Sequence, residues 1–158
     1  MENRRIVIVR IKGKTGLKKT PKDTLKMLRL YKKHTCVVVS NSDSYIGMIK
    51  KIKDHATWGE VDESTLKNLM EKRGRLALKK PVTEAYVKEK LNMNIGEFVK
   101  QVMEFKKELK DLPGLKPFFK LSPPKGGFEQ GGIKKQFAQG GVLGYRKEKI
   151  NDLVKKMI

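Results

Sequence analysis

The chain has 158 residues, with 37 Lys and Arg against 17 Asp and Glu, so its formal net charge at pH 7 is +20. This length favours one domain, or a small domain with an extension. The charge favours a polyanionic partner, nucleic acid first and an anionic membrane second. One cysteine excludes a disulfide framework and a thiolate zinc site within the chain. No apolar stretch approaches the roughly 20 residues that cross a bilayer, and the amino terminus is unlike a signal peptide, so we expect a cytosolic protein.

Strand and helix patterns alternate through the first 62 residues. The β-branched stretch RRIVIVRI predicts a strand, and Thr20-Pro21 with Asp23 predicts the start of a helix. The predicted elements are, in order, strand 4–11, a helix from Pro21, strand 34–41, helix 42–55 and a weaker strand 56–62. This order predicts an α+β fold with a ferredoxin-like βαβαβ core, a small antiparallel sheet carrying two helices on one face.

Helical patterns follow in residues 63–112. We expect a helix that begins at Asp62 and ends at Gly74, then helices in VTEAYVKEKL and NIGEFVKQVMEFKKELKD. The last of these carries an apolar stripe, which we interpret as facing the core: Ile95, Phe98, Val102, Phe105 and Leu109. We therefore divide the chain into a core domain 1–62, a helical extension 63–112 and a final segment 113–158.

The final segment is rich in glycine and proline and alternates aromatic residues with lysines before a short terminal helix. A disordered tail would be poor in aromatic residues. We interpret residues 113–145 as a segment that becomes ordered on RNA, by stacking on bases and by phosphate contact. Docking of its phenylalanines on the helices at 83–110 stays open as the alternative. The terminal helix places Ile150, Leu153, Val154 and Met157 on one apolar face.

The positive charge is concentrated at the two ends of the chain. Residues 1–53 hold 15 basic and 3 acidic residues, a net charge of +12. Residues 54–112 are nearly neutral at +1, and residues 113–158 carry +7. The lysine excess, 30 Lys to 7 Arg, is also compatible with a bias of the genome or growth temperature. The uneven distribution nevertheless indicates that both ends contact one polyanion.

The candidate RNA-binding residues follow from this distribution. A flexible basic loop and the helix after it supply Lys12, Lys14, Lys18, Lys19 and Lys22. The end of the second helix supplies Lys50, Lys51 and Lys53, although the helix dipole alone also favours cations there. The final segment supplies Lys116, Phe118, Phe119, Lys120, Lys125, Lys134, Lys135, Arg146 and Lys147.

The sequence does not match the motifs that bind cofactors or metals or that carry out catalysis. A Walker loop needs glycine where Ile8 stands, and the Gly13-x-x-Gly16 loop follows a strand rather than lying between helices. The two histidines have no spacing typical of metal ligands, and Cys36 fits better as a small apolar residue in a strand. Trp58 fits better as a strand aromatic that closes the core than as a base-stacking residue. We expect no cofactor, no metal, no catalytic residue and no small-molecule substrate.

Several stretches closely resemble one ribosomal protein family. They are TLKMLRL at 24–30, YIGMIKKIKDHATWGEVD at 45–62, RGRL at 73–76 and LKPFFKLSPPKGGF at 115–128. The family is the large-subunit ribosomal protein numbered thirty in bacteria and archaea and seven in eukaryotes. The resemblance covers nearly the whole chain, and the length resembles the archaeal form.

The resemblance implies a ferredoxin-like core and a structural role in the large ribosomal subunit. It also implies contacts with large-subunit rRNA and neighbouring ribosomal proteins, support of subunit assembly and translation, no membrane partner, and a cytoplasmic location in the ribosome. Two other classes stay open: a nucleic-acid-binding module acting outside the ribosome, and a small phosphoryl-transfer enzyme suggested only by the glycine loop.

Overall fold

The computed structural model describes residues 3–158 and confirms the predicted order of the first five elements. They are β1 (Arg5–Arg10), α1 (Lys19–Met27), β2 (Thr35–Ser40), α2 (Asp43–Lys51) and β3 (Ala56–Glu60). β1 lies in the middle and pairs antiparallel with both β2 and β3, so that Val7 lies opposite Val38 on one side and Gly59 on the other. This is the ferredoxin-like core that the alternating pattern predicts.

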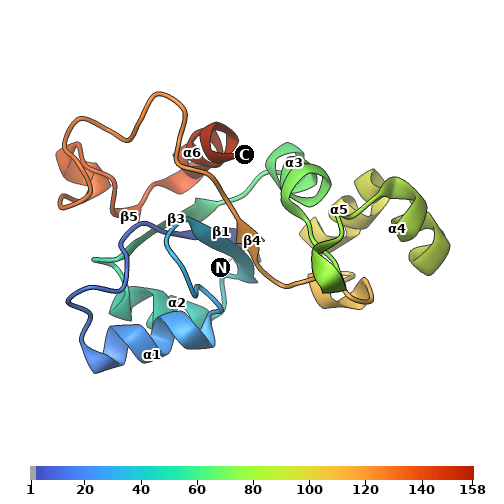
Figure 1. The fold of residues 1–158 in the computed structure, drawn as a ribbon, viewed down its shortest axis with the longest axis horizontal. Coiled ribbons are helices and arrows are strands. Elements are labelled where there is room, and N and C mark those ends of the chain that lie inside the picture. The colour runs from blue at the N-terminus through green and yellow to red at the C-terminus, as the bar shows by residue number, and fades with distance from the viewer. Residues whose placement is uncertain (1–2) are drawn as a thin grey trace.

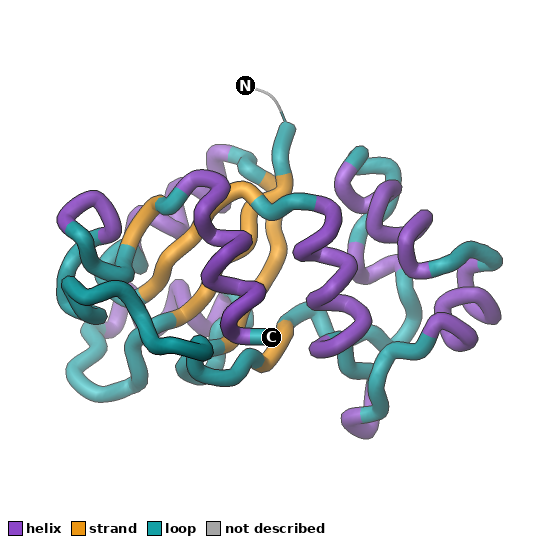
Figure 2. Tube along the Cα trace, turned by 90° about the horizontal axis from the view of Figure 1, so that it is seen from above, coloured by secondary structure: helices purple, strands orange, loops and turns teal. Residues whose placement is uncertain are grey.

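Two further strands come from the glycine- and proline-rich segment and extend the sheet at both edges. β4 (Phe119–Lys120) pairs antiparallel with β2, and β5 (Gly144–Tyr145) pairs parallel with β3. Within the described residues the sheet therefore has the order β4-β2-β1-β3-β5 (Figure 2). The final segment is part of the sheet, and the sheet crosses the boundaries that we drew from the sequence.

The remaining helices cover the second face of the sheet or extend beyond it. They are α3 (Glu63–Arg73), α4 (Glu84–Leu91), α5 (Ile95–Met103) and α6 (Ile150–Met157). The Asp62 carboxylate accepts a hydrogen bond from the Thr65 backbone N–H at 2.7 Å and begins α3 as predicted. Within residues 3–158, no helix is long and apolar enough to cross a bilayer.

The predicted long helix after Asn94 was wrong in its length. α5 ends at Met103, and Phe105 adopts a left-handed conformation with φ of 62°. The backbone N–H groups of Lys106 and Lys107 both donate to the Gln101 carbonyl, which closes the turn. Phe105 therefore leaves the apolar stripe and lies under the Arg5 guanidinium, 4.1 Å from the ring centroid.

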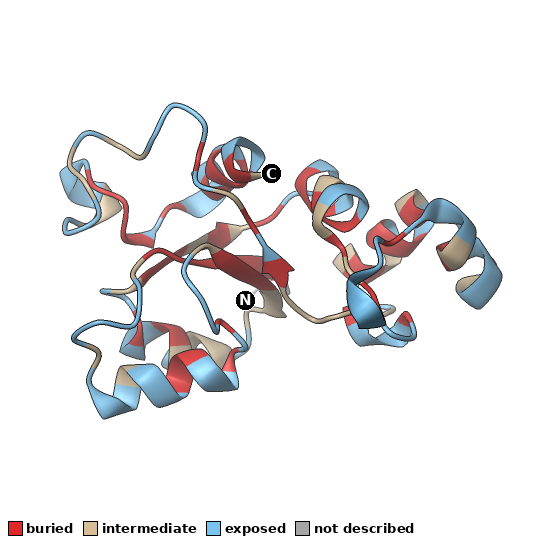
Figure 3. Ribbon diagram, viewed as in Figure 1, coloured by how far each residue is buried: buried red, intermediate tan, exposed pale blue. Residues whose placement is uncertain are grey.

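Helices cover both faces of the sheet (Figure 1), and the sheet and the helix sides that face it are largely buried (Figure 3). Odd-numbered β1 residues such as Val7 and Val9 pack with α3, α5 and α6 in the larger core. Even-numbered Ile6 and Ile8 pack with α1 and α2 in the smaller one. Burial on both faces explains why β1 reads as a continuous apolar run instead of an alternation.

Gly59 allows the terminal helix to approach β3 closely. A Cβ at this position would lie 2.0 Å from the Lys147 carbonyl oxygen and 2.8 Å from Cγ2 of Ile150. Any larger residue would push α6 away from the sheet. The strand pattern next to Trp58 is weak because it contains this glycine, which the packing of α6 against β3 requires.

Candidate nucleic-acid interface

Two of the lysines predicted in the first loop and the helix after it, Lys14 and Lys22, line a pocket beside α1. The loop of residues 11–18 connects the end of β1 to α1, and it leaves Lys14, Lys18, Lys19 and Lys22 exposed and Lys12 half-buried. Between loop and helix lies a cavity of about 320 Å³, the Arg10 pocket. Its lining cations are Arg10, Lys14, Lys22 and Lys26. The lining contains no carboxylate, so the pocket suits an anion.

A second pocket of about 160 Å³ joins residues from two distant parts of the chain. Its lining is Arg73, Arg75, Lys79, Lys116, Phe118 and Lys120. The Arg73 Nη2 donates to the Ser122 hydroxyl at 2.7 Å, and the Arg75 Nη1 donates to the Gly74 carbonyl at 2.9 Å. These two acceptors are neutral, although Arg73 Nη2 also donates to an oxygen of Ile158, the last residue, at 3.4 Å. Arg75 therefore keeps an uncompensated positive charge, and that of Arg73 is compensated only by this longer contact.

One aromatic contact links the two pockets. The rings of Tyr31 and Phe118 meet edge to face with 5.6 Å between their centroids. Tyr31 lines the first pocket and Phe118 the second. We call the two pockets and this aromatic pair the basic face. It combines nine lining cations with aromatic side chains, the composition that single-stranded nucleic acid binds.

Lys12, Lys18 and Lys19 line neither of these pockets, and the same holds for the exposed lysines predicted at the end of α2 and in the final segment, apart from Lys116 and Lys120. Lys50, Lys51 and Lys53 lie at the end of α2. The loop that carries Lys134 and Lys135 comes close to them, because Gln136 Nε2 donates to the Asp54 carboxylate at 3.2 Å. Lys125 lies beside the end of α6, where its backbone N–H donates to the Lys156 carbonyl at 3.0 Å. Lys147 is exposed just before α6.

Two of the predicted RNA-binding residues are structural. Phe119 is completely buried in the larger core, because strand geometry turns it inward while its neighbour Lys120 points outward. Arg146 is 3% exposed and forms a bidentate ion pair with Glu129. Its Nε also donates to the Thr57 hydroxyl at 2.9 Å. Neither side chain is available to a base or a phosphate, and we remove both from the candidate interface.

The remaining phenylalanines of the final segment also dock on protein, away from the helices at 83–110. Phe128 stacks on His34 with 6.1 Å between centroids. Phe137 lies under the Arg146 guanidinium at 4.7 Å. The segment therefore has its own attachment to the sheet, and RNA is not required to explain its aromatic residues.

Several members of the basic face were not predicted from the sequence. Arg10, Tyr31, Arg73, Arg75 and Lys79 were not among the candidates, yet all line the two pockets. The signal for three of them was the run KRGRLALKK at 72–80, whose five cations were averaged into a nearly neutral segment. In this run Leu78 is 87% exposed and, like Lys79, has a left-handed backbone.

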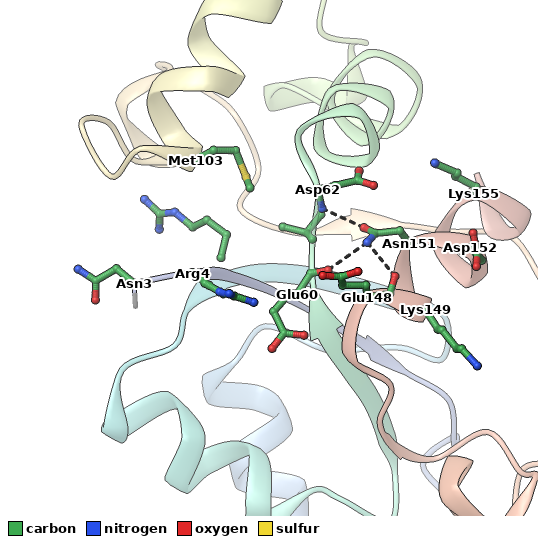
Figure 4. A pocket seen from close by; sticks show the side chains of 12 residues that line it. Asn3, Arg4, Glu60, Asp62, Met103, Glu148, Lys149, Asn151, Asp152 and Lys155 are labelled. Carbon is green, nitrogen blue, oxygen red and sulfur yellow. Dashed lines mark hydrogen bonds between the residues drawn. The ribbon is translucent and has the colours of Figure 1, made fainter. Parts of the chain in front are cut away.

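A different kind of pocket lies at the opposite end of β1, beside Arg5. Figure 4 shows carboxylates of Glu60, Glu148 and Asp152 there, with Asn151 bridging the Asp62 N–H and the Glu60 carbonyl. These hydrogen bonds are 3.0 and 3.1 Å long. The lining of this pocket holds as many carboxylates as basic residues, so it suits a phosphate less well than the two pockets without carboxylates.

Burial shifts the pKa of three titratable side chains near the sheet. Burial raises the pKa of the Cys36 thiol far above its ordinary value, so the thiol stays protonated and packs as an apolar residue, as expected. Burial also lowers the pKa of His34 and of His55 from 6.5, which leaves both imidazoles neutral at pH 7.

The fold and the basic face define an α+β protein with a ferredoxin-like core and a cationic surface fit for a polyanion. Residues 6–55 match the family described as Ribosomal protein L30p/L7e. The chain is 47% identical to the large ribosomal subunit protein uL30 of Methanopyrus kandleri over 149 residues, 94% of this chain and 100% of the relative. The proteins of the same name from Nanoarchaeum equitans and Methanosphaera stadtmanae are 47% and 49% identical. Each match covers 96% of this chain, and 97% and 98% of those relatives.

The chain belongs to the ribosomal protein L30p/L7e family and is of the archaeal type. It is therefore a ribosomal protein, a structural component of the ribosome in the cytoplasm rather than an enzyme. This confirms the resemblance drawn from TLKMLRL and the other stretches.

Proposed function

We propose that this chain is a constituent of the large ribosomal subunit that binds large-subunit rRNA through the basic face and supports subunit assembly and translation. The observation that carries the proposal is that the two pockets are lined by nine cations and no carboxylate. Bringing so many like charges together is unfavourable unless an anion compensates them. A phosphate backbone does so and releases its condensed counterions.

The neighbouring large-subunit proteins belong, in this proposal, at the opposite end of β1. The pocket there carries both carboxylates and basic side chains, such as Glu60, Asp152 and Lys155. Mixed charge of this kind complements a protein surface better than a phosphate backbone. RNA and protein partners are thus assigned to opposite ends of the sheet.

The test measures association of the full chain with large-subunit rRNA at fixed salt. A variant with Arg73, Arg75, Lys79 and Lys116 changed to Gln should lose at least tenfold in affinity. A control variant with Lys88, Lys90, Lys100 and Lys110 changed to Gln removes the same charge from the helical extension and should lose much less. Equal losses would show that only net charge matters and would overturn the assignment to the basic face.

A role in the subunit has a separate test. The chain should stay with the large subunit when ribosomes are sedimented through a high-salt wash. A protein that is released by the wash, and that binds unrelated RNA or DNA equally well, is instead a nucleic-acid-binding module acting outside the ribosome.

A further inference from the structure

The described residues include three arginines whose side chains are nearly fully buried, and one of them lacks a carboxylate. Arg5, Arg10 and Arg146 are 4%, 3% and 3% exposed. Arg5 pairs with Glu108 at 3.0 Å, and Arg146 pairs with Glu129. Buried charges in proteins are almost always paired. Arg10 is the exception, and the pairing of the other two shows that this chain otherwise follows the rule.

The hydrogen bonds of Arg10 leave part of its guanidinium unused. Its Nε donates to the Lys12 carbonyl at 2.9 Å, and its Nη1 donates to the Leu30 carbonyl at 2.7 Å. Its Nη2 is buried and has no hydrogen-bond partner. Two neutral acceptors fix the plane of the guanidinium, while its charge and one donor group have no partner among the described residues.

The Arg10 pocket has a cationic part and an apolar part. Lys14, Lys22 and Lys26 contribute ammonium groups, and Leu17, Leu25 and Leu30 contribute apolar surface. Tyr31 completes the lining with a ring that is 44% exposed and that Phe118 holds in place. The volume, about 320 Å³, falls in the range typical of small-ligand sites, roughly 300–1,000 Å³. An inorganic anion would use the cations and leave the apolar part in water.

We propose that the Arg10 pocket takes one unpaired nucleotide of RNA, with its phosphate on Arg10 and the lysines and its base against Tyr31 and the leucines. A base paired within a duplex cannot enter such a recess, whereas a base in a loop or bulge turns out and stacks on an aromatic ring. The inference rests on the proposed binding of rRNA and names the kind of nucleotide that this site recognises.

The first experiment compares two RNA probes on the full chain, a 12-nucleotide uridine RNA and a 12-base-pair RNA duplex. Tyr31→Ala should weaken binding of the single strand about tenfold, because one stacked base is lost, and should change duplex binding less than twofold. Met27→Ala is the control, since Met27 is 63% exposed at the end of α1, four residues before Tyr31, and does not line the pocket. Equal losses on both probes, or none on the single strand, overturn the proposal.

The second experiment separates a nucleotide site from a simple anion site. Uridine monophosphate added to the full chain should shift the NMR signals of the Arg10 Nε–H and of the Tyr31 ring together. Inorganic phosphate should shift the Arg10 signal alone. Identical responses to the two ligands, or a Tyr31 ring that ignores uridine monophosphate, contradict the proposal.

The experiments distinguish a failure of the nucleotide pocket from a failure of the proposed function. If the wild-type chain does not bind large-subunit rRNA, the proposed function fails. If it binds this rRNA and Tyr31→Ala leaves single-strand binding unchanged, only the nucleotide pocket is wrong.

Discussion

Arg5 and Arg10 lie at the two ends of β1, equally buried but in opposite electrostatic surroundings. At the Arg5 end the chain turns back after α5 and supplies Glu108 at 3.0 Å, the Phe105 ring at 4.1 Å and the Val102 carbonyl at 2.9 Å. At the Arg10 end the guanidinium meets only two carbonyls of the chain and a pocket of lysines. The protein completes the first site itself and leaves the second to an external anion.

Burial has different consequences at these two ends. Burial lowers the pKa of Arg10, as expected of a desolvated cation without a counter-ion. The Glu108 carboxylate at the Arg5 end is 49% exposed, so water as well as Arg5 stabilises its charge. The comparison predicts that the Arg5 end serves stability and the Arg10 end serves binding.

The largest expected effect concerns β4, whose Phe119 points into the core and whose Lys120 points to the surface near the Arg10 end of the sheet. Phe119→Ala should destabilise the free protein by about 3–5 kcal/mol, because it opens a cavity among fully buried side chains. Lys120→Gln, one residue further along the strand, should change the free energy of unfolding by less than about 0.5 kcal/mol. Denaturant unfolding of both variants measures the difference. Similar losses of stability would contradict the assignment of Phe119 to the core and of Lys120 to the surface.

The direct comparison of the two ends uses the same substitution in each. Arg5→Met removes a buried ion pair and should cost about 2–4 kcal/mol of stability, below the upper range for buried pairs because Glu108 is half exposed. Arg10→Met loses two hydrogen bonds but also removes an unpaired buried charge, so we expect a net cost below about 1 kcal/mol. Only Arg10→Met should weaken single-stranded RNA binding, by about tenfold. A larger stability loss for Arg10→Met than for Arg5→Met would reverse our reading of the two ends.

The pair of Glu129 and Arg146 should make stability depend on acid pH. Burial acts to raise the pKa of Glu129, but its hydrogen bonds with Arg146 and the backbone, together with the charges of Arg146 and Lys156, outweigh burial and hold this pKa below its ordinary 4.5. A carboxylate of this kind stabilises the fold above the unfolded pKa, and the contribution is lost as pH falls through the lower folded pKa. Between about pH 5 and pH 3, Tm should therefore fall more steeply for the wild type than for Glu129→Gln. Glu89→Gln, at an exposed position on α4, is the control and should follow the wild type.

The order of the elements was predictable from sequence because it depends on local periodicity. The apolar runs gave β1, β2 and α6, and the cap at Asp62 gave α3. Strands of two residues, such as β4 and β5, carry no periodicity, so the extension of the sheet was not predictable. The turn at Phe105 that follows the end of α5 brings this ring against Arg5, which lies far away in the sequence, so no local pattern predicts it.

The site was predictable only in part, because the charge of whole segments located the basic loop and hid the cations at 72–80. The loop lysines were found, whereas Arg73 and Arg75 join Lys116 and Lys120 only through the fold. The distinction between Phe118 and Phe119 shows the same limit. Which of these two identical neighbours points inward follows from the pairing of Phe119 with Cys36, a register that no local pattern contains.

The smallest effect on stability, and the clearest on binding, is expected in the loop beside Arg10. Lys14, Lys18 and Lys19 are exposed, so changing all three to Gln should alter the free energy of unfolding by less than about 0.5 kcal/mol. Each lysine that contacts a phosphate releases counterions when RNA binds, so their loss should flatten the plot of log affinity against log salt by about 0.7–0.9 per contact.

The matched control for the loop changes Lys88, Lys100 and Lys110 to Gln. These side chains are also exposed, but they lie on the nearly neutral extension. Both variants lose three positive charges, so any difference in salt slope between them reports position rather than net charge. If the two slopes fall by the same amount, RNA senses only the overall charge of the protein and the Arg10 end has no special role. If only the loop variant loses slope while both keep the wild-type stability, the loop lysines contact phosphate and the fold does not depend on them.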